Sequence, residues 1–371
     1  MSFPTRPISR RTLMRGLAAG SSLVPLASLA LAQDDKPKDK IGYCIVGLGR
    51  ISLQHFMPGC LQAKKSKIVA LVSGHREKAV ETAKAYNVAE SSIYSYDNYE
   101  QIADNREIDA VYIALPNNMH AEYTIRAAKA GKHVLCEKPM STNVNEAQAM
   151  INACKAAGKR LMIAYRCQYE PTNLRAVELI KSGRLGAVQS IESAYGFNER
   201  AGEWRLNKKM AGGGPLMDVG IYALNACRYL TDEEPRYIEG FCSVIDRDGR
   251  FDQVEENVAW VMRFPSGIMA SCNTTYGARM NGFFRVHGSK GVMHVEPAFS
   301  YDGLQLRAQI NGEPELLEPN NEKDPAQFTR EADHFSNCIL NNEEPKSNGD
   351  EGLRDMHYIA EIYKSCGRQA F

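Results

Sequence analysis

The alternation of short apolar runs with helical stretches between residues 41 and 164 constrains the fold of this chain more than any other feature. Strands that alternate with helices form βαβ units, which build a parallel sheet covered by helices on both faces. Two helical stretches, Ala121–Ala130 and Asn145–Ala157, stop at a glycine, which is typical of a helix C-terminus. The predicted strands are Ile41–Val46, Ile68–Val72, Ala110–Ala114, His133–Cys136 and Leu161–Ala164. We therefore predict an α/β chain that begins with a doubly wound domain over residues 41–164.

The pattern changes after residue 185, where longer strands follow one another through tight turns. This spacing predicts a C-terminal α+β domain, residues 165–371, with a large open and mostly antiparallel sheet. One helical stretch, Pro215–Leu230, interrupts the strands, and two amphipathic helices near 325–340 and 350–366 close the chain. The predicted strands are Val188–Tyr195, Tyr237–Ile245, Val258–Phe264, Ile268–Tyr276, Phe283–His287, Val292–Val295 and Leu304–Ala308.

The first strand runs directly into a glycine-containing turn with the pattern G-x-G-x-x-S. Gly47 permits a tight turn, and Gly49 lets the backbone approach a pyrophosphate at the following helix N-terminus. Ser52 stands where a third glycine is usual, and it is still small enough for close packing of helix against strand. The motif predicts a Rossmann dinucleotide site, with Leu48, Arg50 and Ile51 completing the turn.

The second strand ends in Ser73-Gly74-His75-Arg76-Glu77-Lys78. An NAD site usually carries an acidic residue at the strand end, which holds the ribose hydroxyls. Here a hydroxyl, from Ser73, and two cations, from Arg76 and Lys78, are offered instead, and these groups suit a 2′-phosphate. We predict NADP as the cofactor, with Gly74 and His75 also in contact; the alternative is a solvated surface turn.

Two further segments supply candidate catalytic residues. Lys138 follows the predicted strand His133–Cys136, and the carboxyl ends of parallel strands face the ligand in such sheets. Asp218 and Tyr222 are four residues apart and share one face if their segment is helical. We predict that Tyr222 takes a substrate hydroxyl proton, that the Lys138 ammonium lowers the tyrosine pKa, and that Asp218 orients the substrate or shares the proton.

The N-terminus carries an export signal. Residues 9–14 read Ser-Arg-Arg-Thr-Leu-Met, a mild apolar stretch follows, and Ala30-Leu31-Ala32 suits a signal peptidase. This predicts a twin-arginine signal over residues 1–32, a short polar arm over 33–40, and export of the folded protein to the periplasm. A membrane span is the alternative, but charge and proline interrupt the run. The chain has 45 basic and 44 acidic residues, and four of the basic ones are arginines of the signal. Without the signal the formal charge is therefore about −3, which favours neither nucleic acid nor a membrane as partner.

The ten cysteines lie scattered along the chain without a C-x-x-C pair. We interpret them as buried free thiols, which suits a protein that folds in the reducing cytoplasm. The eight histidines are scattered as well, and no metal-ligand spacing occurs, so we predict no metal site.

Taken together, these segments resemble the Gfo/Idh/MocA family and, within it, the glucose–fructose and aldose–aldose oxidoreductases. The resemblance rests on Gly47–Ser52, Leu115–His120, Ala130–Pro139, Leu161–Arg166, Trp204-Arg205 and Ala211–Tyr222. It implies a catalytic set of Lys138, Asp218 and Tyr222, with Arg166 joining them in substrate binding. By position it also implies cofactor contacts from Ser73, Arg76, Lys78, Tyr96, Leu115, Pro116, Asn117, His120, Glu137, Lys138, Arg166, Trp204 and Arg205.

The resemblance further implies a closed redox cycle. One aldose is oxidised at C1 to an aldonolactone, a second sugar is reduced to an alditol, and tightly bound NADP stays in place between the two steps. Because free NADP is not expected outside the cytoplasm, the export signal favours this cycle. The alternatives are an ordinary NADP-dependent aldose dehydrogenase, an exported nicotinamide-dependent glycosidase, and a sugar sensor without catalysis. The short polar arm favours a homodimer through the open sheet face over a tetramer.

Overall fold

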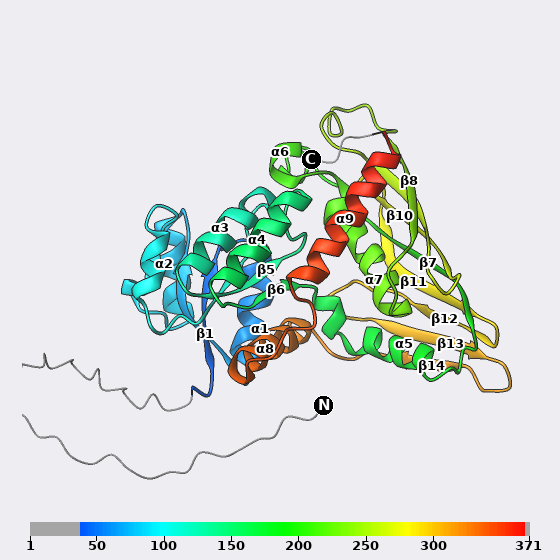
Figure 1. Cartoon of the computed structure of the whole chain (residues 1–371), viewed down its shortest axis with the longest axis horizontal. Helices are drawn as coiled ribbons and strands as arrows, with labels where there is room; N and C mark the ends of the chain where they lie inside the picture. The colour runs from blue at the N-terminus through cyan, green and yellow to red at the C-terminus, as the bar shows by residue number, and fades with distance from the viewer. Residues whose placement is uncertain (1–37, 368–371) are drawn as a thin grey trace, which may run out of the picture. The chain divides into compact units, whose positions relative to one another are not determined.

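The computed structural model describes residues 38–367, which contain two β-sheets and the helices that cover them (Figure 1). The predicted export signal and most of the predicted polar arm lie outside the described residues. The end of the arm is described, and there Lys38 Nζ lies 2.7 Å from the Asp109 carboxylate.

The N-terminal sheet is parallel throughout, with the strand order β3-β2-β1-β4-β5-β6 that is typical of the Rossmann fold. β1 and β4, at its centre, are completely buried, which explains their unbroken apolar runs. The strands are β1 (Ile41–Val46), β2 (Ser66–Val72), β3 (Ile93–Tyr94), β4 (Ala110–Ile113), β5 (His133–Glu137) and β6 (Leu161–Ala164). The predicted fold of this half is confirmed.

Helices cover both faces of this sheet. Figure 1 shows α3 and α4 side by side on one face, while α1 packs against β2 on the other. α8, from near the end of the chain, packs beside α1 and contacts β1 and β2. The helices and helical turns up to residue 169 are η1 (Ser52–Phe56), α1 (Met57–Gln62), α2 (Arg76–Ala85), η2 (Glu90–Ser92), η3 (Tyr99–Asp104), α3 (Asn117–Lys129), α4 (Val144–Ala156) and η4 (Arg166–Tyr169).

The second sheet has eight strands in the order β14-β13-β12-β11-β7-β10-β9-β8. Every neighbouring pair is antiparallel except β7 and β10, so the predicted open, mostly antiparallel sheet is confirmed. Its strands are β7 (Val188–Gly196), β8 (Tyr237–Ser243), β9 (Asn257–Arg263), β10 (Met269–Thr275), β11 (Met280–Gly288), β12 (Gly291–Val295), β13 (Gln305–Ile310) and β14 (Leu316–Pro319).

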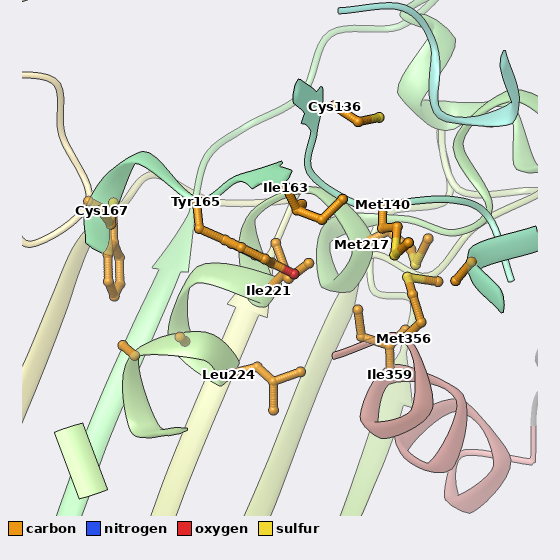
Figure 2. Packing of buried hydrophobic residues seen from close by; sticks show 14 of the residues in the cluster. Cys136, Met140, Ile163, Tyr165, Cys167, Met217, Ile221, Leu224, Met356 and Ile359 are labelled. Atoms are coloured by element: carbon orange, nitrogen blue, oxygen red, sulfur yellow. The ribbon is translucent and has the colours of Figure 1, made fainter. Parts of the chain in front are cut away.

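In the part of the chain that the structure describes, the helices pack on one face of this sheet, and α9 lies between it and the N-terminal half (Figure 1). Figure 2 shows the core at this junction, where Met140 and Ile163 meet Ile221 of α7 and Met356 and Ile359 of α9. Burial of these side chains couples the two halves of the molecule. The remaining helical elements are α5 (Pro171–Lys181), η5 (Trp204–Leu206), α6 (Lys208–Ala211), η6 (Leu216–Gly220), α7 (Ile221–Thr231), α8 (Ala326–Asn341) and α9 (Gly349–Ser365).

The opposite face of the eight-stranded sheet carries exposed apolar side chains. Phe241 of β8 is 72% exposed, and Val261 of β9 and Met269 of β10 are 41% and 49% exposed. The pairing register places all three on the same face, because Glu239 pairs with Val261 and Met269 pairs with Arg263.

The interpretation of all ten cysteines as free thiols is wrong for two of them. Cys242 of β8 and Cys366, at the end of α9, form a disulfide with their Cα atoms 5.4 Å apart. The sequence could not predict this pair, because its members are 124 residues apart and belong to elements that meet only in the fold. The other eight cysteines are free and buried, as interpreted.

None of the helices between residues 38 and 367 combines the length and the apolar character needed to cross a bilayer.

Candidate active site

A cleft of about 430 Å³ opens at the carboxyl ends of the parallel strands. Residues of the phosphate turn, the ends of β4 and β5, and the segment before α7 all line it. Its size lies in the range of ligand pockets. It contains Gly49, Arg50, Ile51, Leu115, Pro116, Asn117, His120, Glu137, Lys138, Arg166, Trp204, Arg205, Asp218 and Tyr222 among the predicted site residues.

The phosphate turn is shaped for a dinucleotide. Gly47 has φ +94°, and a Cβ there would lie 2.5 Å from the Ala114 carbonyl oxygen. Gly49 is exposed, and a Cβ there would meet no protein atom within 4 Å, so its backbone is open to a phosphate. Ser52 Oγ donates a 2.7 Å hydrogen bond to the Gly47 carbonyl. Serine in place of the third glycine therefore braces the turn, and the residues present fit the pyrophosphate of a dinucleotide.

The predicted 2′-phosphate residues lie near one another but are engaged with protein partners. Lys78 Nζ donates to the carbonyl of Leu48 at 2.6 Å, so it lies against the phosphate turn. Arg76 is 58% exposed and pairs with Glu90 at 2.9 Å. Exposed pairs of this kind are weak, so an incoming phosphate could replace Glu90.

The remaining residues at this end form a small turn. Ser73 Oγ accepts a hydrogen bond from the His75 backbone N–H at 3.0 Å. A Cβ on Gly74 would lie 3.2 Å from the Tyr96 ring, so the strand end packs closely on that ring. His75 and Tyr96 therefore flank the same turn, outside the residues that line the cleft.

Two polar residues after β4 hold the cleft wall together. Asn117 Nδ2 donates to the Ala211 carbonyl at 2.8 Å and so ties α3 to α6. Both ring nitrogens of His120 lie within 2.9 Å of backbone carbonyls, those of Pro139 and Leu115. Burial lowers the pKa of His120. Through the Pro139 carbonyl, His120 holds the backbone next to Lys138.

Lys138 and Asp218 meet directly in the cleft. Lys138 Nζ donates to the Asp218 backbone carbonyl at 2.6 Å and to Oδ1 at 3.2 Å. Arg205 Nε and the Tyr276 hydroxyl both donate to Oδ2, at 2.9 Å and 2.8 Å. The Asp218 carboxylate therefore accepts hydrogen bonds from two cations and a phenol.

These partners decide the charge of Asp218. Burial alone would raise its pKa, but the nearby Lys138 and Arg205 outweigh burial and lower the pKa to about 2. A carboxylate with so low a pKa is a poor proton acceptor at neutral pH. Of the two predicted roles, orientation fits this geometry and sharing of the proton does not.

Tyr222 lies beneath the ammonium rather than beside it. Lys138 Nζ is 4.6 Å from the ring centroid, and the Arg166 guanidinium carbon is 5.1 Å from it. Burial raises the Tyr222 pKa well above its usual value, and Arg166 is the cation that opposes this most. The prediction of a lowered Tyr222 pKa is therefore wrong, because burial outweighs the cations that lie near the ring.

The segment that carries both residues is helical, but not regular. Asp218 lies in η6, a π-helical turn, and Tyr222 lies in the first turn of α7. The wider turn directs Asp218 toward Arg205 and Tyr276, while Tyr222 packs against Tyr195 and Phe299 at centroid distances of 5.8 Å and 5.7 Å. Such π-turns are frequent at functional sites.

Arg166 is buried, and its hydrogen bonds all go to protein atoms. Its guanidinium donates to the Phe299 carbonyl at 2.6 Å, to Gln327 Oε1 at 2.7 Å and to the Ser300 carbonyl at 3.2 Å. The structure therefore gives Arg166 a role in holding the loop that carries Tyr301, whose ring lies 4.4 Å from the guanidinium carbon.

Two other predicted contacts have defined partners. Glu137 Oε1 accepts a 2.7 Å hydrogen bond from Tyr112, and burial raises the Glu137 pKa. The Arg205 guanidinium carbon lies 4.8 Å from the Trp204 ring centroid, so the two side chains make a cation–π contact at the cleft.

Several residues of this cleft were not predicted from the sequence. Tyr276 binds Asp218 but comes 58 residues later, at the end of β10. His55, Tyr195 and Tyr301 also line the cleft. His55 follows the phosphate motif by one helical turn, so its position in a helix was predictable. The side of that helix on which His55 lies, which faces the cleft, was not predictable.

A phosphate turn on a Rossmann sheet, next to a cleft with a lysine and a tyrosine, defines a nicotinamide-dependent oxidoreductase. Residues 41–165 match the family model "GFO_IDH_MocA: Oxidoreductase family, NAD-binding Rossmann fold", and residues 173–294 match the GFO/IDH/MocA C-terminal domain. The chain belongs to the Gfo/Idh/MocA oxidoreductase family.

Individual relatives agree with this assignment. The chain is 31% identical over 330 residues to a D-xylose 1-dehydrogenase [NADP(+)] of Haloarcula marismortui, which covers 88% of this chain and 91% of the relative. It is 30% identical to D-xylose 1-dehydrogenase (NADP(+)) 2 of Haloferax volcanii, over 87% and 96% of the two chains. Among solved structures, aldose–aldose oxidoreductase from Caulobacter crescentus, complexed with glycerol, is 42% identical, with a TM-score of 0.85 over 88% of this chain and 98% of that one.

Proposed function

We propose that this protein is an NADP-dependent sugar oxidoreductase that oxidises an aldose at C1 to an aldonolactone and reduces a second sugar, an aldose or a ketose, to an alditol. The observation that carries the proposal is the 42% identity to an aldose–aldose oxidoreductase over nearly the whole of that chain. The two xylose dehydrogenase relatives, whose names include NADP, support an aldose as the substrate and NADP as the cofactor.

NADP would be held by the turn Gly47–Ser52, by Ser73, Arg76 and Lys78 near the second strand, and by the ends of β4 and β5. When bound, it would accept a hydride from the first sugar and donate a hydride to the second. As the phenolate, Tyr222 takes the proton of the C1 hydroxyl during oxidation, and as the phenol so formed it returns that proton during reduction. Because burial raises the Tyr222 pKa, the phenol has to give up its proton before the oxidation begins. Lys138 binds a substrate oxygen, and Asp218 keeps the ammonium in place.

Asp218 contributes by position and charge. Its carboxylate fixes Lys138 on one side and Arg205 on the other, so these two cationic donors are in position before the reaction begins. Arg166 and Trp204 also line the walls of the cleft.

A closed cycle with retained NADP has a direct test. The purified protein should carry NADP and convert a pair of sugars to a lactone and an alditol without added cofactor. Bound NADPH should appear in the near-ultraviolet absorbance when one aldose is added and should disappear when the second sugar follows. A protein that is purified empty and turns over only with free NADP contradicts the cycle, and the ordinary aldose dehydrogenase, favoured by the xylose dehydrogenase relatives, then replaces it.

The glycosidase alternative has its own readout. Release of a chromogenic aglycone from a glycoside would replace the proposed cycle with a transient oxidation. The chain lacks the acidic residue at the second strand end that such a nicotinamide enzyme was expected to carry.

We also propose that the mature protein is exported to the periplasm through its twin-arginine signal and that it forms a homodimer. Support for the dimer is the row of exposed apolar side chains on the open sheet face, where Phe241, Val261 and Met269 lie on neighbouring strands. Clusters of this kind mark interfaces in soluble proteins. A second copy of the chain is the proposed occupant.

A further inference from the structure

His55 lies in the wall of the cleft that holds Lys138 and Tyr222. It belongs to η1, which begins at Ser52 of the phosphate motif. Its Nδ1 lies 2.8 Å from Asp324 Oδ2, and its side chain is 13% exposed. Asp324 precedes α8, so this contact joins the start of the chain to its last quarter.

The partner of Nδ1 determines what the other ring nitrogen can do. A carboxylate oxygen can only accept a hydrogen bond, so the Nδ1 atom carries the hydrogen. In the neutral ring Nε2 then presents a lone pair. Among residues 38–367 no hydrogen-bond partner of Nε2 is found, and His55 lines the same cleft as Lys138 and Tyr222.

The ring is also held in a fixed orientation. It stacks on Tyr301 with a centroid distance of 4.0 Å and on Phe328 with a distance of 5.5 Å. Tyr301 itself contacts the Arg166 guanidinium on the loop that Arg166 anchors. A hydrogen-bond acceptor that is fixed before the ligand arrives loses little conformational entropy on binding.

We infer that His55 Nε2 accepts a hydrogen bond from a hydroxyl group of the bound sugar, with Asp324 as the positioning residue that fixes the ring. The sugar as ligand rests on the proposed function. The alternative hydrogen-bond donor to Nε2 is the carboxamide of the nicotinamide ring of the cofactor. The ring neighbours of His55, Tyr301 and Phe328, come from the C-terminal half rather than from the phosphate turn, and this favours the sugar.

Three substitutions of His55 distinguish the contribution of Nδ1 from that of Nε2. His55→Phe keeps a ring for stacking and removes both nitrogens. His55→Gln places an amide near the position of Nε2, and His55→Asn places one near that of Nδ1. His357→Phe, on the exposed surface of α9, is the matched control.

The experiment measures binding of glucose and of xylose to the NADP-loaded protein by calorimetry. His55→Phe should weaken sugar binding about tenfold, which corresponds to one lost hydrogen bond. His55→Gln should restore most of the affinity and His55→Asn should not, while the fraction of purified protein that carries NADP and the thermal midpoint stay unchanged in all variants and the control.

Each other outcome contradicts the inference in a distinct way. If the sugar affinity of His55→Phe is unchanged, His55 makes no hydrogen bond to the sugar. If that variant loses bound NADP, the hydrogen bond goes to the cofactor instead. If only His55→Asn restores the sugar affinity, His55 acts through its contact with Asp324 and not through Nε2. Absence of sugar binding in the wild type also overturns it. A wild type that binds sugar and forms no NADPH contradicts the proposed function alone, because the affinities still decide the role of His55.

Discussion

The Lys138 ammonium lies 4.6 Å from the centre of the Tyr222 ring and directs its hydrogen bonds to Asp218. The lysine is thus held against the aromatic face by a cation–π contact and anchored by a carboxylate that cannot itself take a proton readily. The position of the ammonium, rather than its effect on the tyrosine pKa, is what the protein arranges before a ligand binds.

Replacement of this lysine should stop hydride transfer without emptying the cofactor site. In Lys138→Met the rate of NADPH formation in a single turnover should fall by roughly 10²–10⁴, because a positioned cation next to the reacting oxygen is lost. Stopped-flow absorbance measures the rate. Lys364→Met, at an exposed position of α9, should react like the wild type. A normal rate in Lys138→Met would remove this lysine from the mechanism.

Tyr222→Phe should keep the ring contact with Lys138 and lose only the hydroxyl. We expect the single-turnover rate to fall by about 10²–10⁴, while bound NADP is retained, since proton transfer is lost and packing is conserved. Tyr86→Phe, at the end of α2 and away from the cleft, is the control. If sugar still reduces the cofactor at the normal rate, the proton is carried by another group.

Asp218→Asn tests the charge assignment through stability. The folded-state pKa of about 2 lies below the usual 3.8, so the ionised carboxylate stabilises the fold above the usual value. This contribution, about 2 kcal/mol, should be lost as the pH falls from about 4 to about 2. Denaturant unfolding at several pH values should therefore give a difference between wild type and Asp218→Asn that is constant near neutral pH and shrinks in acid. A difference that changes near neutral pH contradicts the low pKa; Asp104→Asn, at an exposed position, is the control.

The Cys242–Cys366 disulfide should stabilise the protein under oxidising conditions. It closes a loop of 124 residues between β8 and the end of α9, and loops of such length give a stabilisation of roughly 2–5 kcal/mol. A reductant should lower the thermal midpoint of the wild type. The double variant Cys242→Ser/Cys366→Ser should unfold at the lower temperature and show no response to the reductant; a response would point to a second disulfide.

The open sheet face should lose its partner when charge is placed on it. Phe241→Asp should convert a dimer to a monomer, because a carboxylate buried in an apolar interface is costly. Light scattering after gel filtration measures the mass. Leu61→Asp introduces the same charge at an apolar position of α1 that is 63% exposed, and it should leave the mass unchanged. A wild-type monomer would refute the proposed dimer directly.

Much of this fold could be predicted because local sequence patterns indicate its strands and helices. The strands Ile41–Val46 and Leu161–Ala164 were predicted with the bounds that the structure has, since buried parallel strands form unbroken apolar runs between polar turns. The short strands β3 and β14 were missed, because two or four residues on a sheet edge leave almost no periodic signal.

The site was predictable only in part, because a local sequence pattern carries no information on contacts between distant segments. Motifs placed Lys138 and Asp218 at one edge of the molecule, and the structure brings them together. The partners that set their properties, such as Tyr276 for Asp218, arrive from distant strands, and no local pattern encodes such a contact. The predicted direction of the Tyr222 pKa was wrong because burial outweighs the nearby cations, and the extent of burial cannot be read from residue spacing.

The contact of α8 with the first strands has a consequence for how the protein is made. Phe328, Ala332 and Phe335 belong to the same buried cluster as Tyr43 of β1 and Leu71 of β2. A nascent chain that has completed all six strands of the Rossmann sheet still exposes that apolar surface to water, because the helix that covers it is synthesised more than 150 residues later. The Rossmann half can therefore bury its complete core only when translation is almost finished.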